Sequence, residues 1–389
     1  MKLFKTIFAA ILSLAIFCGA VSAELFSSSH YGWTLDLPEG FFLSDATDDG
    51  LSYFFEHDFM KVRLAIKIFP RGKFQRNDLA MEDTLNKLRA DGEIDGFLWR
   101  ERQVSIANFS FQIPGNKTAQ SGWGISASLP KSGADIVVIC YADSENSNDV
   151  QQFIISALDS IVIEESDWRK PGIITSYAFP TRQKKDIAIQ IDGKDIFTKI
   201  PAEASDSANF VIEREFSVLT LYSARKNWKE AWQRYYRLIF REAYSRLDDA
   251  ARDIYNSLGE TILNAENGGR MLELTRRLLA WVQDFQYNRL QNKSDFNDIA
   301  SVLQDKGSDC DSRSLLLCVL MEHYGVKSEL FISGEYSHAI CGFDLPGKGA
   351  RINVDGTNYL LCETTAHVEP GLVAQEHSDT NKWISVDLP

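Results

Sequence analysis

One segment near the C-terminus constrains the fold more than any other. Residues 315–321 are apolar without interruption. A helix formed by them is apolar on every side and must lie inside a domain rather than on its surface. Asp309 is a favourable N-cap residue, and Gly325 suits the C-cap position. We therefore predict a buried helix that begins at Cys310 and ends just before Gly325, with other elements packed around it.

Apolar spacing elsewhere indicates both strands and helices. Residues 62–68 and 187–191 alternate between apolar and polar types, which is typical of strands with one wet face. The Asp-Gly pair at 192–193 is a strong hairpin signal, and residues 210–222 are predicted to supply further strand material. Residues 228–247 have helical spacing and an aromatic stripe that we expect to be core. The predicted fold class is α+β, with an N-terminal α/β sandwich, a small β-containing connector with long helices, and a C-terminal α+β domain.

Length and composition indicate a globular protein of two or three domains. The chain has 389 residues, of which 44% are hydrophobic and 24% charged, which excludes a mainly disordered or fibrous chain. The net charge of −13, without a basic block, argues against nucleic acid or an anionic membrane as the main partner. We predict four parts: a signal peptide over 1–23, an α+β domain over 24–165, a linker with a small β region and a long helix over 166–258, and a C-terminal domain over 259–389.

The N-terminus has the composition of a secretory signal peptide. Lys2 and Lys5 precede an apolar run over 7–21, and small residues at 21–23 offer a cleavage site. The run is shorter than the ~20 residues that a membrane span needs, and no later segment approaches that length. We expect a periplasmic or otherwise secreted protein with no stable membrane span after cleavage. An uncleaved N-terminal anchor is the alternative.

The cysteine count draws attention to one thiol. The chain has six cysteines, and removal of Cys18 with the signal peptide leaves five, an odd number in a compartment that permits disulfides. These five are Cys140, Cys310, Cys318, Cys341 and Cys362. Cys310 is expected in the first helical turn, where free N–H groups and the helix dipole favour a thiolate. No zinc-ribbon spacing is present, so we predict no metal and no cofactor.

Strand-like segments after the buried helix carry a histidine and two carboxylates. If the strands that hold His338 and Glu363 are antiparallel neighbours, these side chains share one face, and Cys341 and Cys362 share the other. A cysteine on a helix, a histidine on a strand and a carboxylate on the next strand are the parts of a thiol triad. Asp355 competes for the third position, but its Asp-Gly sequence is typical of a tight turn.

Residues 278–365 resemble the transglutaminase-like core of the papain-like cysteine-enzyme superfamily. The motifs that carry this resemblance are, in chain order, Trp281-Val282-Gln283-Asp284-Phe285-Gln286-Tyr287, Gly307-Ser308-Asp309-Cys310, Tyr324-Gly325-Val326, Ser337-His338-Ala339 and Glu363-Thr364-Thr365. The resemblance implies Cys310 as nucleophile, His338 as general base and acid, and Glu363 as the residue that orients His338. This chain departs from the family in two positions, because the third member is usually an aspartate and a glycine usually replaces Ser308. The N-terminal region weakly resembles PsbP-like α/β/α sandwiches, on pattern alone.

The resemblance implies chemistry on amides. The thiolate would attack an amide carbonyl, and the oxyanion would need the backbone N–H of Cys310 and a second donor, for which Gln283 and Gln286 are candidates. Water would then give hydrolysis or deamidation, and an amine would give a crosslink. We predict a cysteine hydrolase or acyltransferase acting on an envelope protein or peptide. The alternatives are a non-catalytic scaffold or binding protein with the same fold, and a cell-wall peptide amidase of NlpC type.

Two acidic residues flank the predicted nucleophile. Asp309 and Asp311 would raise the pKa of the Cys310 thiol if both faced it. We expect Asp309 to cap the helix and Asp311 to project outward.

Overall fold

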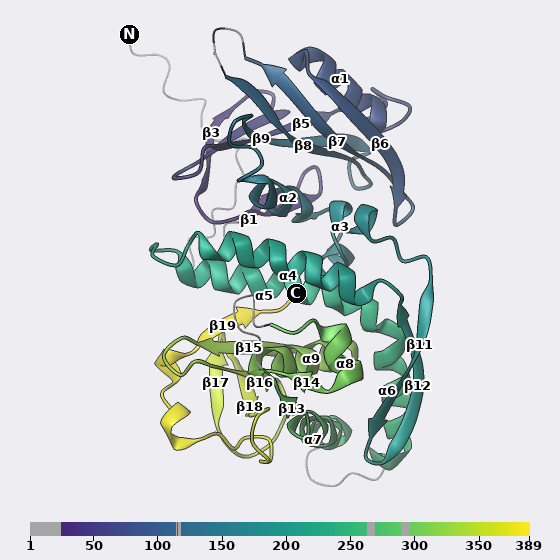
Figure 1. Ribbon diagram of the computed structural model, residues 1–389, viewed down its shortest axis with the longest axis vertical. Coiled ribbons are helices and arrows are strands. Elements are labelled where there is room, and N and C mark those ends of the chain that lie inside the picture. Colours follow the sequence, from purple (N-terminus) through teal and green to yellow (C-terminus); the bar gives the residue numbers. More distant parts are fainter. Residues whose placement is uncertain (1–24, 114, 116–117, 263–268, 289–295) are drawn as a thin grey trace.

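The computed structural model describes residues 25–113, 115, 118–262, 269–288 and 296–389. Figure 1 shows three layers along the long axis: an N-terminal sheet with its helices, a middle layer of long helices, and a C-terminal sheet with its helices. The mixed α+β class predicted from the sequence is confirmed. The predicted signal peptide lies outside the described residues. Within the described ranges, every helix is too short or too polar to cross a bilayer.

The N-terminal layer is built on a seven-stranded antiparallel sheet in the order β3-β4-β5-β9-β8-β7-β6. Its two faces are both covered, because Val137 and Ile139 pack in the core under α1, whereas Ile136 and Val138 pack in the core under α2. A small sheet of β1, β2 and β10 lies beside α2. The bounds are β1 (Leu25–Ser28), β2 (Trp33–Asp36), β3 (Phe41–Ala46), β4 (Ser52–His57), β5 (Val62–Phe69), α1 (Asp78–Leu88), β6 (Asp91–Trp99), β7 (Arg102–Gln112), β8 (Ala119–Leu129), β9 (Ala134–Asp143), α2 (Gln151–Asp159) and β10 (Ile161–Val162).

The middle of the chain forms a hairpin and three long helices. The predicted hairpin turn is confirmed, with Asp192 and Gly193 both at positive φ (51° and 70°). The predicted strand over 210–222 is wrong, because most of it belongs to α4. Buried Ala208 and Ile212 recur at helical spacing on this helix, so the segment buries one helical face. The bounds are α3 (Ile173–Ala178), β11 (Lys184–Ile191), β12 (Lys194–Pro201), α4 (Ala204–Thr220), α5 (Trp228–Tyr244) and α6 (Asp248–Ile262).

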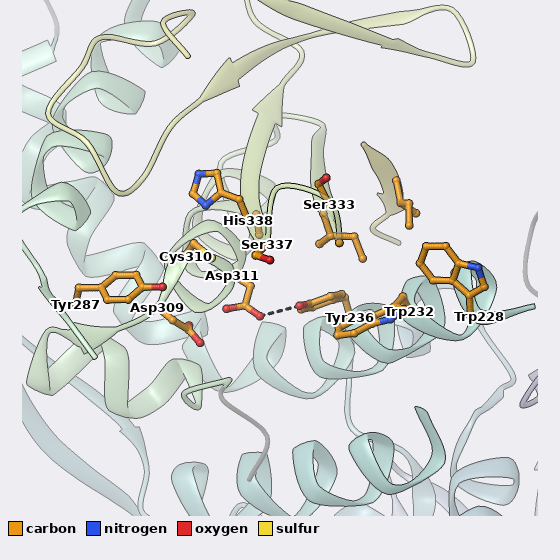
Figure 2. A pocket seen from close by; sticks show the side chains of 14 residues that line it. Trp228, Trp232, Tyr236, Tyr287, Asp309, Cys310, Asp311, Ser333, Ser337 and His338 are labelled. Carbon is orange, nitrogen blue, oxygen red and sulfur yellow. Dashed lines mark hydrogen bonds between the residues drawn. The ribbon is translucent and has the colours of Figure 1, made fainter. Parts of the chain in front are cut away.

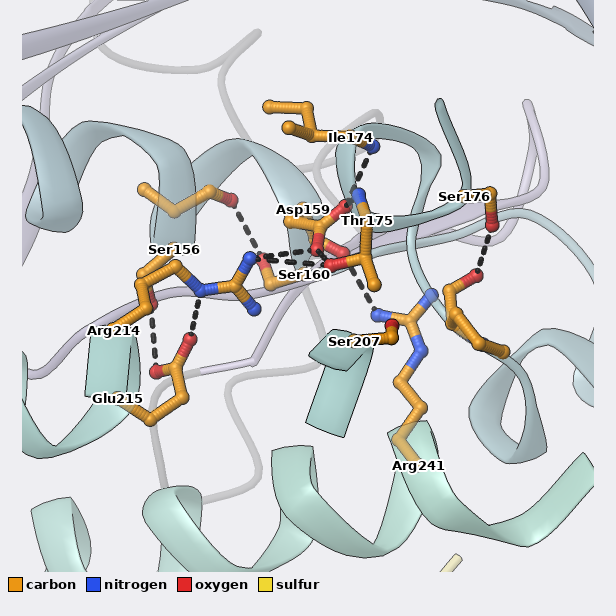
Figure 3. A network of polar contacts seen from close by, with 12 residues as sticks. Ser156, Asp159, Ser160, Ile174, Thr175, Ser176, Ser207, Arg214, Glu215 and Arg241 are labelled. Atoms are coloured by element: carbon orange, nitrogen blue, oxygen red, sulfur yellow. Dashed lines mark hydrogen bonds and ion pairs between the residues drawn. The ribbon is translucent and has the colours of Figure 1, made fainter. Parts of the chain in front are cut away.

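Buried arginines fix the middle helices to the N-terminal layer (Figure 3). Arg214 of α4 forms ion pairs with Asp159 (2.9 Å) and Glu215 (2.6 Å). Arg241 of α5 donates to four backbone carbonyls, including those of Asp159 (3.0 Å) and Ile161 (2.7 Å). Because buried charges are tolerated only when they are paired and hydrogen-bonded, this network holds α5 in one position.

The C-terminal layer is a five-stranded antiparallel sheet in the order β17-β18-β16-β15-β19, against which α9 packs. The predicted buried helix is confirmed as α9, with Asp309 at its N-cap and Gly325 at positive φ (76°) just after it. The parallel pair of β13 and β14 lies at the start of α9. The bounds are α7 (Gly269–Gln283), β13 (Gln286–Tyr287), α8 (Ile299–Asp305), β14 (Gly307–Ser308), α9 (Cys310–His323), β15 (Ser328–Ser333), β16 (His338–Phe343), β17 (Arg351–Val354), β18 (Thr357–Cys362) and β19 (Ile384–Asp387).

Candidate active site

A cleft of about 220 Å³ lies where α5, the start of α9 and the turn before β16 meet. Figure 2 shows Cys310 and His338 toward one end of it and the α5 aromatic side chains toward the other. The lining residues are Trp228, Trp232, Tyr236, Tyr287, Asp309, Cys310, Asp311, Ile332, Ser333, Gly334, Ser337, His338, Ala339 and Ile384. The structure therefore brings together the cysteine and the histidine that were singled out from the sequence.

Cys310 is the first residue of α9, and its neighbour Asp309 caps the helix. The Asp309 carboxylate accepts a hydrogen bond from the backbone N–H of Ser312 (3.2 Å), as predicted. All five cysteines of the described chain are free, and Cys310 is partly exposed whereas the other four are buried. Accessibility thus distinguishes Cys310 from the other thiols.

His338 and Glu363 form a hydrogen-bonded pair, with 2.8 Å between His338 Nε2 and Glu363 Oε2. The antiparallel register of β16 and β18 sets Cys341 opposite Cys362. This register leaves His338 and Glu363 on the other face of the sheet, as strand parity predicts. In the neutral ring, Nε2 donates to the carboxylate and Nδ1 keeps the lone pair. Both His338 and Cys310 line the cleft.

The second oxygen of the Glu363 carboxylate also accepts hydrogen bonds. The backbone N–H and the hydroxyl of Thr365 donate to Glu363 Oε1 at 2.8 and 2.6 Å. Burial acts to raise the pKa of Glu363, but the hydrogen bonds and charge from His338 and the hydrogen bonds from Thr365 lower it overall. Glu363 is therefore an ionised carboxylate with a fixed orientation, suited to holding the imidazole of His338.

Arg313 joins the segments that carry the site. Its guanidinium donates to the Ser308 hydroxyl (2.9 Å), to the Phe285 carbonyl (2.7 Å) and to the Thr364 carbonyl (3.3 Å). The side chain is buried, so these contacts fix the start of α9, β13 and the chain after Glu363 relative to one another. The sequence analysis missed this residue, although a single arginine in a helix that is otherwise buried and mainly apolar is a signal for such a contact.

The two glutamines proposed as oxyanion donors do not line the cleft. Gln283 is buried, and its side-chain amide donates to the carbonyls of Glu363 (2.8 Å) and Val368 (3.0 Å). Gln286 is exposed in β13, where its backbone pairs with Gly307. In this structure Gln283 supports the segment that carries Glu363, and the backbone N–H of Cys310 is the expected oxyanion donor that stays at the cleft.

The charges around Cys310 differ from the sequence-based expectation. Burial raises the pKa of the Cys310 thiol to about 12, and the carboxylates of Asp311 and Asp309 add to this effect. The helix N-terminus alone would favour a thiolate, so the structure gives the opposite direction to that expectation. Burial and the neighbouring Asp311 likewise raise the pKa of Asp309 to about 9. At neutral pH the resting residue is a thiol.

The predicted outward projection of Asp311 is wrong. The side chain lines the cleft and accepts a hydrogen bond from the Tyr236 hydroxyl at 2.7 Å (Figure 2). Tyr236 was missed in the sequence because its role depends on contact between two helices 75 positions apart.

The α5 aromatic stripe, predicted to be core, is divided between core and cleft. Tyr235, Ile239 and Phe240 are buried. Trp228 is 36% exposed and lines the cleft with Trp232. One end of the stripe is therefore available to a ligand.

Asp355 lies at the tip of the turn between β17 and β18, where it is exposed and has a positive φ of 47°. It is not among the residues that line the cleft. The local backbone assigns it to the turn, in agreement with the sequence analysis.

The comparisons with known proteins gave matches of low similarity to solved structures. No protein-family model matches the sequence, and a search of curated proteins gave no match. One similar solved structure is cyanobacterial PsbP (CyanoP) from Synechocystis sp. PCC 6803, 13% identical, covering 38% of this chain and 97% of that chain with a TM-score of 0.32. A second is the Ran-binding protein Mog1p from Saccharomyces cerevisiae, 7% identical, covering 36% and 94% with a TM-score of 0.28.

A third match is a protein from Bacteroides thetaiotaomicron VPI-5482, 8% identical, covering 87% of this chain and 89% of that chain with a TM-score of 0.27. The TM-scores of these three matches are all 0.32 or lower, and none of them supports a statement about the fold or the chemistry of this chain.

Proposed function

We propose that this protein is an exported cysteine enzyme that cleaves or transfers the acyl group of an amide in an envelope protein or peptide, through a transglutaminase-like C-terminal domain. The observation that carries the proposal is the geometry of His338. Its Nε2 is held by the ionised Glu363 at 2.8 Å, and it shares a cleft with the partly exposed Cys310 at the tip of a buried helix. This is the arrangement that a nucleophile, a base and an orienting group require.

The raised pKa of Cys310 sets the order of the proton transfers. The thiol proton passes to Nδ1 of His338 as Sγ bonds to the amide carbon, so the thiolate need not exist at rest. The C–N bond then breaks, and His338 returns the proton to the departing amine. Attack by water on the thioester releases an acid and restores the thiol, whereas attack by an amine gives a new amide. Glu363 keeps His338 in the required tautomer throughout.

Intact-mass measurement with an electrophilic glutamine-peptide or peptide-amide probe tests the proposal. We expect a single adduct on the wild-type protein and none on Cys310→Ala. Cys318→Ala is the matched control, because Cys318 lies in the same helix but is buried, and it should be modified like the wild type. Modification that survives in Cys310→Ala would contradict the proposal.

A non-catalytic scaffold or binding protein is the second candidate. Two observations favour it: the pKa of Cys310 is raised rather than lowered, and Gln283 is engaged away from the cleft. An intact fold with no adduct on wild-type protein at any pH between 6 and 10 would select this candidate.

A further inference from the structure

A second imidazole lies beside the His338–Glu363 pair. His377, in a short 3-10 turn (Gln375–His377), has its ring centroid 5.1 Å from that of His338. One ligand atom from each of His338, Glu363 and His377 can be chosen such that all three lie within 4.8 Å of one another. Two imidazoles and a carboxylate are a ligand set that zinc takes in proteins.

Two further observations point to a ligand at this cluster. The Nδ1 atom of His377 is buried and, within the described part of the chain, has no hydrogen-bond partner. Buried polar atoms are normally satisfied, so this nitrogen has a free lone pair or proton directed into the protein. A second cavity, of about 430 Å³, is lined by all three residues and leaves room for a water molecule as a fourth ligand.

We propose that His338, Glu363 and His377 bind a zinc ion, and that its binding switches off the thiol chemistry of Cys310. Tetrahedral coordination at the usual bond lengths places ligand atoms roughly 3.3 Å apart. The three ligand atoms already lie within 4.8 Å of one another, so the cluster needs only small movements to reach this spacing. Imidazole nitrogen favours zinc over calcium and magnesium, which prefer oxygen ligands.

The inhibitory effect follows from the tautomer of His338 and rests on the proposed function. Zinc takes the lone pair of Nε2, the nitrogen that now donates its proton to Glu363. The single ring proton then resides on Nδ1. With Nδ1 protonated, His338 has no lone pair to accept the thiol proton, and Glu363 is engaged by the metal. Zinc release restores the base.

Zinc binding is tested on the Cys310→Ala protein, so that no accessible thiol competes for the metal and no activity is needed. Calorimetric titration with Zn²⁺ in chelator-treated buffer should show one site. We expect His377→Gln to weaken binding at least tenfold in this background. His367→Gln is the matched control, because His367 is an exposed histidine 3.8 Å from Asp284 and outside the cluster, and it should bind as before. Absence of a site, or binding that His377→Gln leaves intact, would overturn the proposal.

The proposed inhibition by zinc is tested by measuring probe acylation with and without Zn²⁺. The quantity compared is the ratio of the two acylation rates within each variant. We expect zinc to suppress acylation of the wild type at least tenfold, with recovery on adding a chelator, and the ratio to approach one in His377→Gln. Equal suppression in both proteins would contradict the inhibitory role. If no variant is acylated under any condition, the proposed function fails, while the titration still decides whether the metal site exists.

Discussion

The Asp309 and Asp311 carboxylates oppose ionisation of the thiol that they flank. In the cleft, Tyr236 orients Asp311, and Asp311 in turn raises the pKa of Cys310 beyond the effect of burial. In the proposed mechanism the cysteine therefore depends on His338 at the moment of attack rather than on a pre-formed thiolate. Two predictions belong to this scale.

The pH dependence of Cys310 alkylation reports this electrostatic arrangement. The rate of iodoacetamide labelling, followed by peptide mapping, should still be rising at pH 9, because the pKa of the thiol is about 12. Asp311→Asn removes a carboxylate beside the thiol and should lower the thiol pKa by about one unit. The thiolate fraction at pH 8, and with it the labelling rate, should then rise by about tenfold. Asp305→Asn, at an exposed carboxylate in α8, should leave the rate unchanged. A plateau below pH 7 would instead indicate a thiolate–imidazolium pair at rest.

Glu363 should matter for turnover and Asp355 should not. Glu363→Gln removes the charge that orients His338 and stabilises its protonated form, and the analogous loss in a serine triad is about 10⁴-fold in rate. Asp355→Asn alters only an exposed turn residue. Probe acylation should therefore fall strongly in the first variant and stay near wild type in the second, with circular dichroism as the folding control. The reverse pattern would require another register for the last two strands of the site.

At the scale of elements, the site depends on how the start of α9, β13 and the chain after β18 are held together. Arg313 makes these contacts from a buried position. A side chain also connects two elements on the other side of the cleft, where Gln233 of α5 donates to the Ser385 carbonyl of β19 at 2.8 Å. The elements that line the cleft are thus connected by side chains rather than by the sheet alone.

Arg313→Met should loosen this arrangement. It leaves three buried acceptors without their donor, and hydrogen bonds of a charged donor contribute about 1.5–3 kcal/mol each. We expect the free energy of unfolding to fall by about 3 kcal/mol or more, and probe acylation of Cys310 to fall with it. Arg351→Met is the matched control, because Arg351 also donates to three carbonyls but is only half-buried and lies in β17, away from the cleft. An equal effect of the two variants on acylation would contradict the positioning role of Arg313.

At the scale of the whole molecule, the N-terminal layer meets the middle helices around Glu39. The Tyr222 hydroxyl of the middle layer donates to the Glu39 carbonyl at 2.7 Å, and His57 Nε2 lies 2.9 Å from the same oxygen. Burial raises the pKa of the Glu39 carboxyl to about 7, against the lowering effect of Arg234. A carboxyl whose pKa is higher in the folded than in the unfolded state makes the fold less stable as pH rises between the two values.

Glu39→Gln should therefore change the pH dependence of stability. The ordinary pKa of the group is 4.5 and the folded value about 7, so the wild type loses stability from about pH 4.5 to pH 7 through this residue. The full effect corresponds to about 3 kcal/mol. The variant cannot ionise at this position and should gain thermal stability relative to wild type at pH 8 but not at pH 4. An equal difference in melting temperature between variant and wild type at both pH values would show that folding does not raise the pKa of Glu39.

Local sequence rules were sufficient for the parts of this protein that depend on neighbouring residues. The α9 helix follows from its apolar run and its cap at Asp309, and the hairpin at 192–193 follows from the backbone freedom of Asp-Gly. Strand parity set His338 and Glu363 on one face once the two strands were taken as antiparallel neighbours, because side chains alternate along each strand.

Contacts between distant segments were decided only by the tertiary structure. The direction of Asp311 depends on Tyr236 in α5, and the length of α4 depends on a buried face that a short apolar run does not distinguish from a strand. The same holds for Arg313, whose hydrogen-bond partners lie on three separate segments. It also holds for His377, which reaches His338 from a turn 39 residues later. Burial, together with the flanking carboxylates of Asp311 and Asp309, also reversed the expected direction of the Cys310 pKa. The helix dipole and the two carboxylates are local, whereas desolvation depends on everything that packs around the thiol.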